Sequence, residues 1–340
     1  MAARAFICGV SGTILSADER AFLRDANPWG VILFRRNTDD PEQVRRLCSS
    51  IREALGRDDA PILIDQEGGR VQRMGPPHFR AYPPASRFGE IYLGNSLAGV
   101  EAAYLGAMLI ALDLSSIGIT VDCIPVLDIP VEGATAAIGT RALGLTVDAV
   151  ATLGGAQIDG LIAGGVIPVM KHMPGHGRAL VDSHQALPRV DATMDELEGQ
   201  DFTPFRLLAR RAPLGITAHV VFLDIDDGAP ATLSSPVIVN VIRERIGFDG
   251  ALMTDDICMG ALSGSPRERA ERAIAAGCDL VLHCNGVLAE MGGVAEAAPI
   301  LSGEALRRTD AALRLGRHPD QVDRPALERR FDFLLGKAAA

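Results

Sequence analysis

The sequence lacks the cysteine spacing of a disulfide framework or a zinc ribbon. No C-x-x-C pair occurs, and the six cysteines are scattered along the chain. Isolated cysteines of this kind usually behave as small apolar residues, and their scatter is typical of a reducing compartment. We therefore predict a cytoplasmic protein that carries no disulfide bond.

Long apolar segments and an excess of positive charge are also absent. The best apolar candidate, LGAMLIAL, stops before Asp113 and falls short of the ~18 residues that a membrane-spanning helix needs. The N-terminal stretch MAARAFICGVSGTIL has neither the long apolar core nor the cleavage site of a signal peptide. The formal net charge of -10 repels phosphate groups, which argues against nucleic acids and anionic membranes as partners.

The sequence does contain short apolar runs that alternate regularly with helical segments. The runs are continuous rather than alternating, as in strands that are covered on both faces. Eight strands separated by helices favour a single-domain (β/α)8 TIM-type barrel over a doubly wound open sheet. We assign one domain to residues 1–340, with a catalytic core at about 5–300 and a helical tail at about 301–340. The predicted strands are 4–10, 30–34, 61–65, 119–129, 166–172, 215–222, 251–256 and 279–284, and the helices between them are 41–57, 96–114, 146–165, 194–211, 235–247 and 265–277.

Six of the predicted strands finish in ionisable or hydrogen-bonding side chains. A single aspartate at a strand end is commonly the N-cap of the next helix, but six such ends in register need another explanation. The carboxyl ends of barrel strands share one mouth, where active sites lie, so we predict the site there. The residues are Asp65, Asp128, Lys171 with His172, His219, Asp255 with Asp256, and His283 with Asn285.

The stretch KHMPGHGRALVDSH, residues 171–184, concentrates three histidines. His172 and His176 are four residues apart, which suits two metal ligands on one helix face. The proline and glycines between and beside them disfavour a helix, although a metal-dependent hydrolase that gathers ligands from several strand ends stays an alternative. A phosphate loop is a weaker alternative, because no G-x-x-x-x-G-K-[ST] pattern occurs.

The end of the same stretch suggests acid/base chemistry. Asp182 precedes His184 by two residues, which is close enough for a carboxylate to orient an imidazole and favour its protonated form. An imidazole held in this way can give and retrieve a proton near neutral pH.

Taken together, the motifs resemble those of one enzyme family. KHMPGHG followed by DSH resembles the signature of glycoside hydrolase family 3 β-N-acetylhexosaminidases, and ILIDQEGGRVQR at 62–73 resembles their other hallmark. GVILFRRN, IGTRALG, ITAHVVF, ALMTDDICMGAL and DLVLHCNG match in order, so the resemblance covers residues from about 25 to about 290. The nearest likeness is to the single-domain, cytoplasmic bacterial members that act in peptidoglycan recycling.

The resemblance implies a retaining mechanism with a histidine in place of one of the two usual carboxylates. Asp255 corresponds to the nucleophile, His184 to the proton donor and acceptor, and Asp182 to its dyad partner. The glycine-containing loop that carries the dyad is expected to move over the pocket. Implied substrate contacts are Asp65, Arg73, Arg141, Lys171 and His172.

Several nearby polar residues keep two interpretations. Asp256 either is the nucleophile in place of Asp255 or caps and supports its surroundings. Arg70 either reaches the site or pairs with Glu67. Asp128, His176, His219 and His283 either line the pocket or support it from behind.

The implied function is an exo-β-N-acetylglucosaminidase that releases terminal GlcNAc from GlcNAc-1,6-anhydro-MurNAc, with or without peptide. It would act as a monomer and would need no metal or cofactor. The low aromatic content of 4% suits a pocket for one terminal sugar better than an open cleft for a polymer. A β-glucosidase of the same superfamily and a catalytically inactive sugar-binding barrel are the alternatives.

Three positions depart from the commoner family pattern. Met173 stands in place of phenylalanine, which we interpret as a packing change, and Cys258 stands in place of serine. Arg178 occurs where relatives often have a short or acidic residue, so it is expected to change the charge of the loop and the preference for the leaving group.

Overall fold

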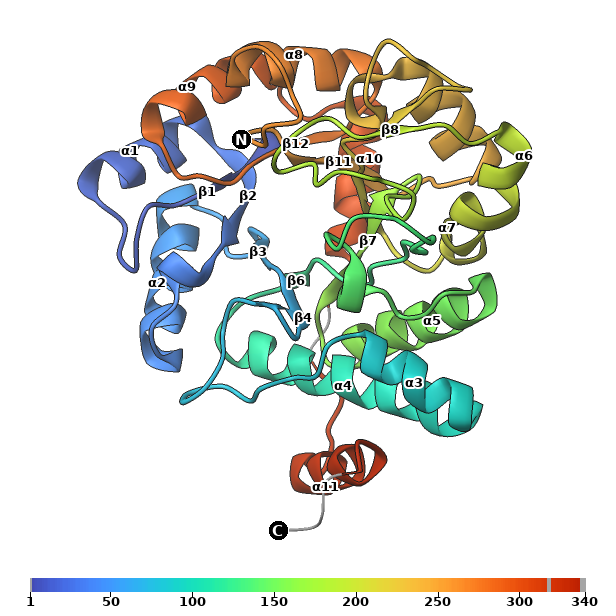
Figure 1. The fold of residues 1–340 in the computed structure, drawn as a ribbon. Helices are drawn as coiled ribbons and strands as arrows, with labels where there is room; N and C mark the ends of the chain where they lie inside the picture. The colour runs from blue at the N-terminus through green and yellow to red at the C-terminus, as the bar shows by residue number, and fades with distance from the viewer. Residues whose placement is uncertain (1, 317–318, 337–340) are drawn as a thin grey trace.

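The computed structural model describes residues 2–316 and 319–336. Eight parallel strands close into a barrel in the order β1-β12-β11-β9-β7-β6-β3-β2 (Figure 1). Each of the eight overlaps a predicted strand, and the prediction of a (β/α)8 barrel is confirmed. The strands are β1 (Arg4–Gly9), β2 (Pro28–Leu33), β3 (Ile62–Ile64), β6 (Val121–Asp122), β7 (Ile167–Met173), β9 (Leu214–Thr217), β11 (Ala251–Asp256) and β12 (Leu280–His283).

Helices surround the barrel on its outer face (Figure 1). Each of the six predicted helical segments is helical in the structure, but 194–211 is divided into α6, a π-helical segment at Leu197–Asp201 and α7, and 235–247 is π-helical at Val237–Arg245. Helices α1, α3 and α9 were not predicted. The α-helices are α1 (Ala17–Ala26), α2 (Pro41–Leu55), α3 (Ser86–Gly94), α4 (Ser96–Ser116), α5 (Val147–Ala163), α6 (Met194–Glu196), α7 (Phe202–Leu208), α8 (Pro266–Ala276), α9 (Leu288–Ala297), α10 (Gly303–Leu313) and α11 (Arg324–Leu334).

Two small sheets lie beside the barrel. β4 (Gln66–Gly68) and β5 (Val71–Gln72) form an antiparallel hairpin directly after β3. β8 (Arg189–Val190) pairs in parallel with β10 (Val221–Phe222). Both sheets follow carboxyl ends of barrel strands, so they add walls to the mouth of the barrel.

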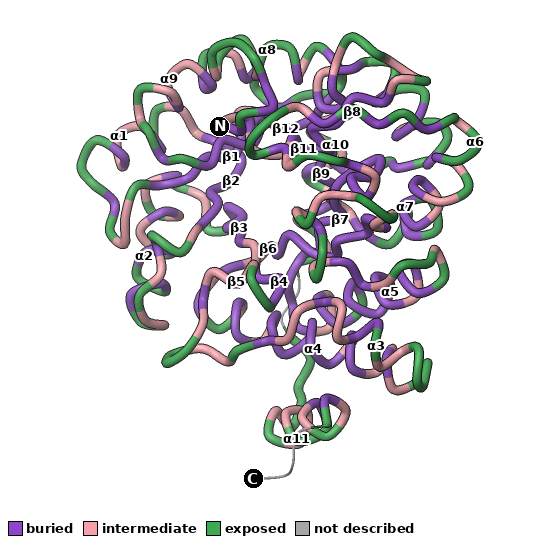
Figure 2. Tube along the Cα trace, viewed as in Figure 1, coloured by how far each residue is buried: buried purple, intermediate pink, exposed green. Residues whose placement is uncertain are grey.

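The barrel strands are almost wholly buried, as their continuous apolar composition predicts (Figure 2). All six residues of β2 are buried. Helix α4 is the one helix in the described chain that is long and apolar enough to cross a membrane, and 67% of its most apolar window is buried. It packs against α5 so closely that a Cβ on Gly160 would lie 2.3 Å from the carbonyl oxygen of Tyr104. Packing against neighbouring helices therefore accounts for the apolar character of α4.

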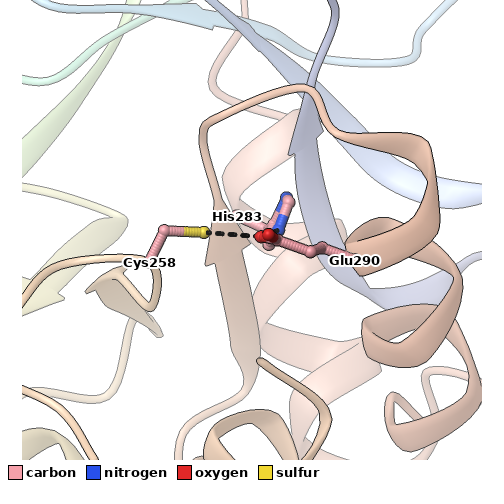
Figure 3. A group of neighbouring side chains, drawn as sticks. All are labelled: Cys258, His283 and Glu290. Carbon is pink, nitrogen blue, oxygen red and sulfur yellow. Dashed lines mark hydrogen bonds and ion pairs between the residues drawn. The ribbon is translucent and has the colours of Figure 1, made fainter. Parts of the chain in front are cut away.

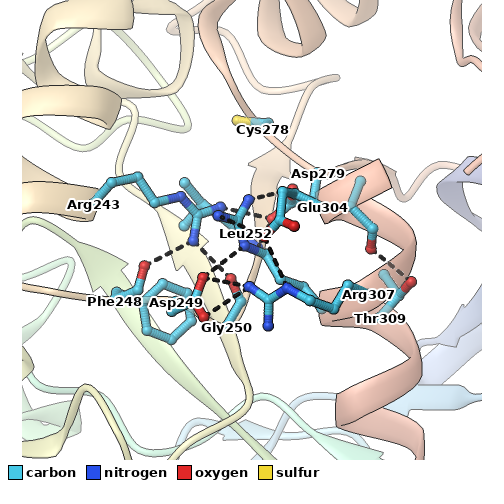
Figure 4. A network of polar contacts seen from close by, with 12 residues as sticks. Arg243, Phe248, Asp249, Gly250, Leu252, Cys278, Asp279, Glu304, Arg307 and Thr309 are labelled. Atoms are coloured by element: carbon cyan, nitrogen blue, oxygen red, sulfur yellow. Dashed lines mark hydrogen bonds and ion pairs between the residues drawn. The ribbon is translucent and has the colours of Figure 1, made fainter. Parts of the chain in front are cut away.

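An ion-pair network fastens α10 to the end of the barrel opposite the mouth (Figure 4). Asp279, just before β12, accepts hydrogen bonds on Oδ2 from Arg243 Nη2 at 2.6 Å and from the backbone N–H of Leu252 at 2.9 Å. Its Oδ1 accepts from Arg308 Nη1 of α10 at 3.1 Å. One buried carboxylate thus joins the amino ends of β11 and β12 to two helices.

The predicted C-terminal helical tail contains α10 and α11, and its residues 317–318 and 337–340 lie outside the described part of the chain. Helix α11 docks on α4 through the fully buried ring of Phe331, whose neighbours include Phe88. Arg324 Nη2 also donates to Asp113 Oδ1 of α4 at 2.6 Å. In the tail, α11 therefore packs on the side of the barrel, and α10 packs on the end opposite the mouth.

Candidate active site

A cavity of about 340 Å³ opens among the carboxyl ends of the strands. This volume lies near the lower end of the ~300–1,000 Å³ range of small-molecule sites, which suits one sugar ring. The structure brings all eight predicted site residues to its walls: Asp65, Arg73, Arg141, Lys171, His172, Asp182, His184 and Asp255.

Asp255 is the carboxylate that β11 delivers to the cavity. Burial by itself would raise the pKa of Asp255, but the charges of His172 and His219 and the backbone N–H of Asp256 outweigh it, so the pKa is held below its usual value. That N–H donates to Asp255 Oδ1 at 2.8 Å. Asp255 is therefore ionised at neutral pH, as a nucleophile requires.

Asp256 also touches the cavity, but its carboxylate is used to hold backbone. Its Oδ1 accepts from the N–H groups of Cys258 at 3.0 Å and Cys284 at 3.1 Å. The ring of His219 donates from Nε2 to the carbonyl of Asp256 at 3.0 Å, and its Nδ1 lies 2.7 Å from the hydroxyl oxygen of Thr232. These contacts fit the supporting interpretation of Asp256 and leave Asp255 as the candidate nucleophile.

The acid/base pair forms as its spacing suggests. Asp182 Oδ1 accepts from His184 Nδ1 at 2.8 Å and from the backbone N–H of His184 at 2.9 Å. Burial opposes ionisation of Asp182, but these hydrogen bonds outweigh it and lower its pKa. Since Nδ1 carries the proton shared with the carboxylate, Nε2 is the nitrogen free to exchange a proton with a substrate. The imidazole side chain is 71% exposed, which leaves it accessible from the mouth.

The loop that carries the Asp182–His184 pair is closely packed where it begins, at His176 and Gly177. Gly177 passes so close to the chain that a Cβ there would lie 2.0 Å from the carbonyl oxygen of Ile129. The backbone N–H of His176 donates to Asp128 Oδ1 at 2.7 Å, and His176 Nε2 is 3.1 Å from the hydroxyl of Ser183. Close packing therefore explains the glycine at 177, and the exposed part of the loop begins after it.

His176 is a neutral link between the start of this loop and the dyad. Burial, reinforced by the nearby His172, lowers the pKa of His176 to about 4. Its ring reaches Ser183, the residue between the two dyad members. Residues 171–184 thus contain both the Asp182–His184 pair and a histidine, His176, that helps to position it.

Arg178 does not line the cavity. Its Nε donates to Asp201 Oδ2 at 2.7 Å and its Nη2 to Gln200 Oε1 at 3.3 Å. The guanidinium therefore fastens the start of the loop to the π-helical segment. The expected influence of Arg178 on the leaving group has no direct contact to support it.

The floor of the cavity is a row of alternating charges. Arg73 Nη2 and Lys171 Nζ each lie 2.8 Å from a different oxygen of Asp65. Lys171 Nζ is also 2.7 Å from Glu67 Oε1, and Arg141 grips both oxygens of Glu67 at 2.8 Å. Burial would raise the pKa of Asp65, but the two cations hold it well below the usual range. The floor thus presents fixed charges that can donate to and accept from sugar hydroxyls.

His172 is oriented toward the cavity from behind. Its Nδ1 lies 2.6 Å from Asp128 Oδ2, and burial of Asp128 is outweighed by the charge of His172, so the pKa of Asp128 is lowered. Asp128, His176, His219 and His283 do not line the cavity. Of the two interpretations given for these four residues, the supporting one is correct.

The sequence did not reveal the roles of two carboxylates, Glu67 and Asp122, or the contacts of Arg70. The sequence suggests Glu67 only as a partner of Arg70, whereas Glu67 pairs with Arg141 and Lys171. Arg70 lines the cavity and donates to the carbonyls of Ala136 and Ala137. The position of Glu67 inside the hallmark DQEGGR was the available signal.

The second missed carboxylate, Asp122, lies fully buried at the end of β6. Its Oδ1 accepts from the N–H of Gln66 at 2.9 Å. Burial raises the pKa of Asp122 to about 8, helped by the charges of Asp65 and Glu67. Its place inside an apolar run gave no sign of a polar role.

Comparison with known proteins relates this barrel to glycosidases. The model of the glycosyl hydrolase family 3 N-terminal domain matches residues 9–314. The β-hexosaminidase of Alkalilimnicola ehrlichii is 40% identical, over 82% of this chain and 79% of its own, and that of Pseudomonas aeruginosa is 36% identical over 81% of each. The chain belongs to glycoside hydrolase family 3.

Solved structures of similar proteins superpose on nearly the whole of this chain. NagZ from Neisseria gonorrhoeae, in complex with N-trifluoroacetyl-D-glucosamine, superposes with a TM-score of 0.89 at 31% identity, covering 100% of this chain and 99% of that one. A family 3 β-N-acetylglucosaminidase from Paenibacillus sp. str. FPU-7 gives 0.82 at 32% identity and covers 99% of this chain but 62% of its own. This chain is accordingly a glycoside hydrolase with β-N-acetylhexosaminidase activity.

Proposed function

We propose that the enzyme is a retaining exo-β-N-acetylglucosaminidase that releases terminal GlcNAc from GlcNAc-1,6-anhydro-MurNAc, with or without peptide. The observation that carries the proposal is the presence of Asp255 and the Asp182–His184 pair on the walls of one cavity of about 340 Å³. The bound N-trifluoroacetyl-D-glucosamine of the gonococcal NagZ supports an N-acylated sugar as the ligand.

In the first step, the ionised Asp255 attacks the anomeric carbon while His184 Nε2 gives its proton to the departing oxygen. The glycosidic C–O bond breaks, and a glycosyl ester forms on Asp255. Asp182 stabilises the imidazolium before this transfer and holds the ring in place through Nδ1.

In the second step, water attacks the anomeric carbon while His184 Nε2 takes its proton. The ester bond to Asp255 breaks and GlcNAc leaves with retained configuration. The imidazole is again protonated, so the cycle closes without a metal or cofactor.

The shape of the cavity supports action on chain ends. Arg70, bound to the carbonyls of Ala136 and Ala137, lines one wall. The floor charges lie beneath the sugar position, and the exposed His184 lies at the mouth, where a leaving group would extend. We further propose a cytoplasmic monomer, in keeping with the six free cysteines.

The test is the Asp255→Ala variant on an aryl N-acetyl-β-glucosaminide. Loss of the nucleophile is expected to lower kcat by about 10⁴-fold or more, with an unchanged circular dichroism spectrum and melting temperature within a few degrees. Full activity would overturn the assignment. On the wild type, proton NMR of the first-formed sugar is expected to show the β-anomer, since inversion would exclude the covalent route.

Two substrate comparisons test the finer claims. An aryl β-glucoside is expected to be cleaved far more slowly than the N-acetyl compound, and the reverse order would favour the β-glucosidase alternative. A panel of GlcNAc-anhydro-MurNAc with and without peptide is expected to be cleaved, whereas binding without cleavage would indicate an inactive sugar-binding barrel.

A further inference from the structure

Cys258, His283 and Glu290 form a compact group that the catalytic chemistry does not use, which we call the Cys–His–Glu cluster (Figure 3). Cys258 lies in the loop after β11, His283 ends β12 and Glu290 belongs to α9. Their ligand atoms all lie within 4.8 Å of one another. Three separate elements therefore direct a thiol, an imidazole and a carboxylate to one point.

The spacing is poor for hydrogen bonds and good for a metal ion. His283 Nε2 lies 3.4 Å from Glu290 Oε2, whereas N–H···O bonds centre on about 2.9–3.0 Å. Cys258 Sγ lies 3.9 Å from the same oxygen. A tetrahedral ion with bonds of about 2.0–2.3 Å holds neighbouring ligand atoms about 3.3–3.7 Å apart. Small side-chain adjustments would bring all three atoms to one ion.

The ring of His283 is also poorly satisfied without an ion. Its side chain is fully buried, and Nδ1 has no hydrogen-bond partner within residues 2–316 and 319–336. A buried imidazole whose other nitrogen makes one long contact is unfavourable. A metal bond to Nε2 would replace the long contact to Glu290 with a short one.

The surroundings hold the other two ligands in place. Asn285 Nδ2 donates to Glu290 Oε2 at 2.6 Å, as outer partners of a metal carboxylate do. The backbone N–H of Cys258 is tied to Asp256 Oδ1 at 3.0 Å. Because the side chain of Glu290 is 40% exposed, one side of the cluster is open to water, which can supply a fourth ligand.

We propose that the Cys–His–Glu cluster binds one zinc ion through Cys258 Sγ, a ring nitrogen of His283 and a carboxylate oxygen of Glu290, with water completing a tetrahedron. Thiolate, imidazole and carboxylate are the ligand types that zinc takes in proteins. On binding, the thiol proton is released to solvent. The ion would join the loop behind Asp255 to β12 and α9, outside the catalytic steps proposed above.

Cobalt(II) replaces zinc with a visible signature and tests the cluster directly. The metal-stripped, reduced His184→Ala protein serves as parent, because it removes the exposed imidazole as a competing ligand. Titration with cobalt(II) alone is expected to give a thiolate-to-cobalt charge-transfer band that saturates at one equivalent and disappears on adding zinc.

Matched variants assign the band. Cys258→Ser is expected to abolish it, whereas Cys278→Ser, at a buried cysteine bonded to the carbonyl of Thr232, is expected to keep it. Glu290→Gln should weaken zinc binding at least about tenfold, while Glu296→Gln on the same helix should not. No band in the parent, or an equal band in Cys258→Ser, overturns the proposal.

Thermal unfolding supplies an independent measurement. Zinc at about a hundred times its dissociation constant is expected to raise the melting temperature of the parent by about 4 °C. The rise should vanish in Cys258→Ser and persist in Cys278→Ser. Equal shifts in both variants would place the stabilising zinc elsewhere and overturn the assignment.

Discussion

A single carboxylate oxygen, Asp182 Oδ1, fixes the orientation of the His184 ring. Asp182 Oδ1 accepts from both the ring Nδ1 and the backbone N–H of His184, so the ring cannot present Nδ1 to a substrate without breaking its contact with Asp182. The arrangement fixes which nitrogen transfers the proton, while exposure at the mouth leaves that nitrogen accessible.

Replacing His184 with alanine should therefore make activity depend on the leaving group. We expect kcat/KM to fall about 10³-fold for substrates with poor leaving groups and far less for nitrophenyl substrates, whose departure needs no proton. Steady-state kinetics over a series of aryl N-acetylglucosaminides measures this slope. Equal losses across the series would show that His184 is not the proton donor.

Ser183 offers a test of positioning. Its hydroxyl contacts His176 Nε2 at 3.1 Å, between the two dyad residues, and it does not line the cavity. Ser183→Ala is expected to lower kcat about tenfold with little change in KM. Without the hydroxyl contact, Asp182 and His184 are held less well in position, while the residues that bind the sugar are unchanged.

The control is Ser234→Ala, a buried serine that donates to Asp226 Oδ2 at 2.6 Å away from the loop. It should lose stability without losing kcat. If both variants keep wild-type kcat, the His176–Ser183 contact has no positioning role.

At the scale of elements, the strands were predictable because each is a continuous apolar run. Two predicted strands differ from the structure: 215–222 is divided between β9 and β10 of separate sheets, and 119–129 contains only β6, Val121–Asp122. Pro125 has no N–H to donate, and pairing resumes as a single bridge between Val126 and Lys171. The third of the unpredicted helices, α9, begins without a side-chain cap, so its start had no local signal.

One element contact carries a stability prediction. Asp279 joins Arg243, Arg308 and the N–H of Leu252 and is 5% exposed. Asp279→Ala would leave Arg243 and Arg308 without this carboxylate partner. It is expected to lower the free energy of unfolding by about 3–5 kcal/mol. Urea denaturation measures the loss.

Arg307→Ala is the matched comparison on α10. Its partner Asp249 is 67% exposed, so its loss is expected to change the free energy of unfolding by less than about 1 kcal/mol. Equal effects for the two variants would contradict the importance of burial in this network.

At the scale of the whole molecule, the sequence predicted which residues line the cavity but not which ion pairs they form. All eight predicted residues reach one cavity, because the carboxyl ends of barrel strands share a mouth. The sequence could not show that Lys171 would bridge Asp65 and Glu67. Such pairings depend on distances across the barrel, which motifs do not encode.

Asp122 makes the stability of the whole fold depend on pH. Its pKa is raised by burial from 3.8 to about 8, so between these values the folded chain binds a proton that the unfolded chain has lost. This contribution is present at low pH and is lost as pH rises toward 8.

Asp122→Asn removes that dependence. The stability of the variant relative to wild type is expected to increase from pH 5 to pH 8 by at most about 1.4 kcal/mol per pH unit. Melting temperatures of the two proteins over this range measure it, and a constant difference would show that Asp122 is ionised throughout.

The alternating row on the cavity floor has a consequence for how the enzyme can diverge. Arg73, Asp65, Lys171, Glu67 and Arg141 form a chain of ion pairs, and removing one leaves a neighbouring charge without one of its partners. Single substitutions in the row should be selected against, and viable ones should arise as compensating pairs. New sugar or leaving-group preferences are then expected to evolve through the walls, at positions such as Arg70 and Met259, while the floor stays unchanged.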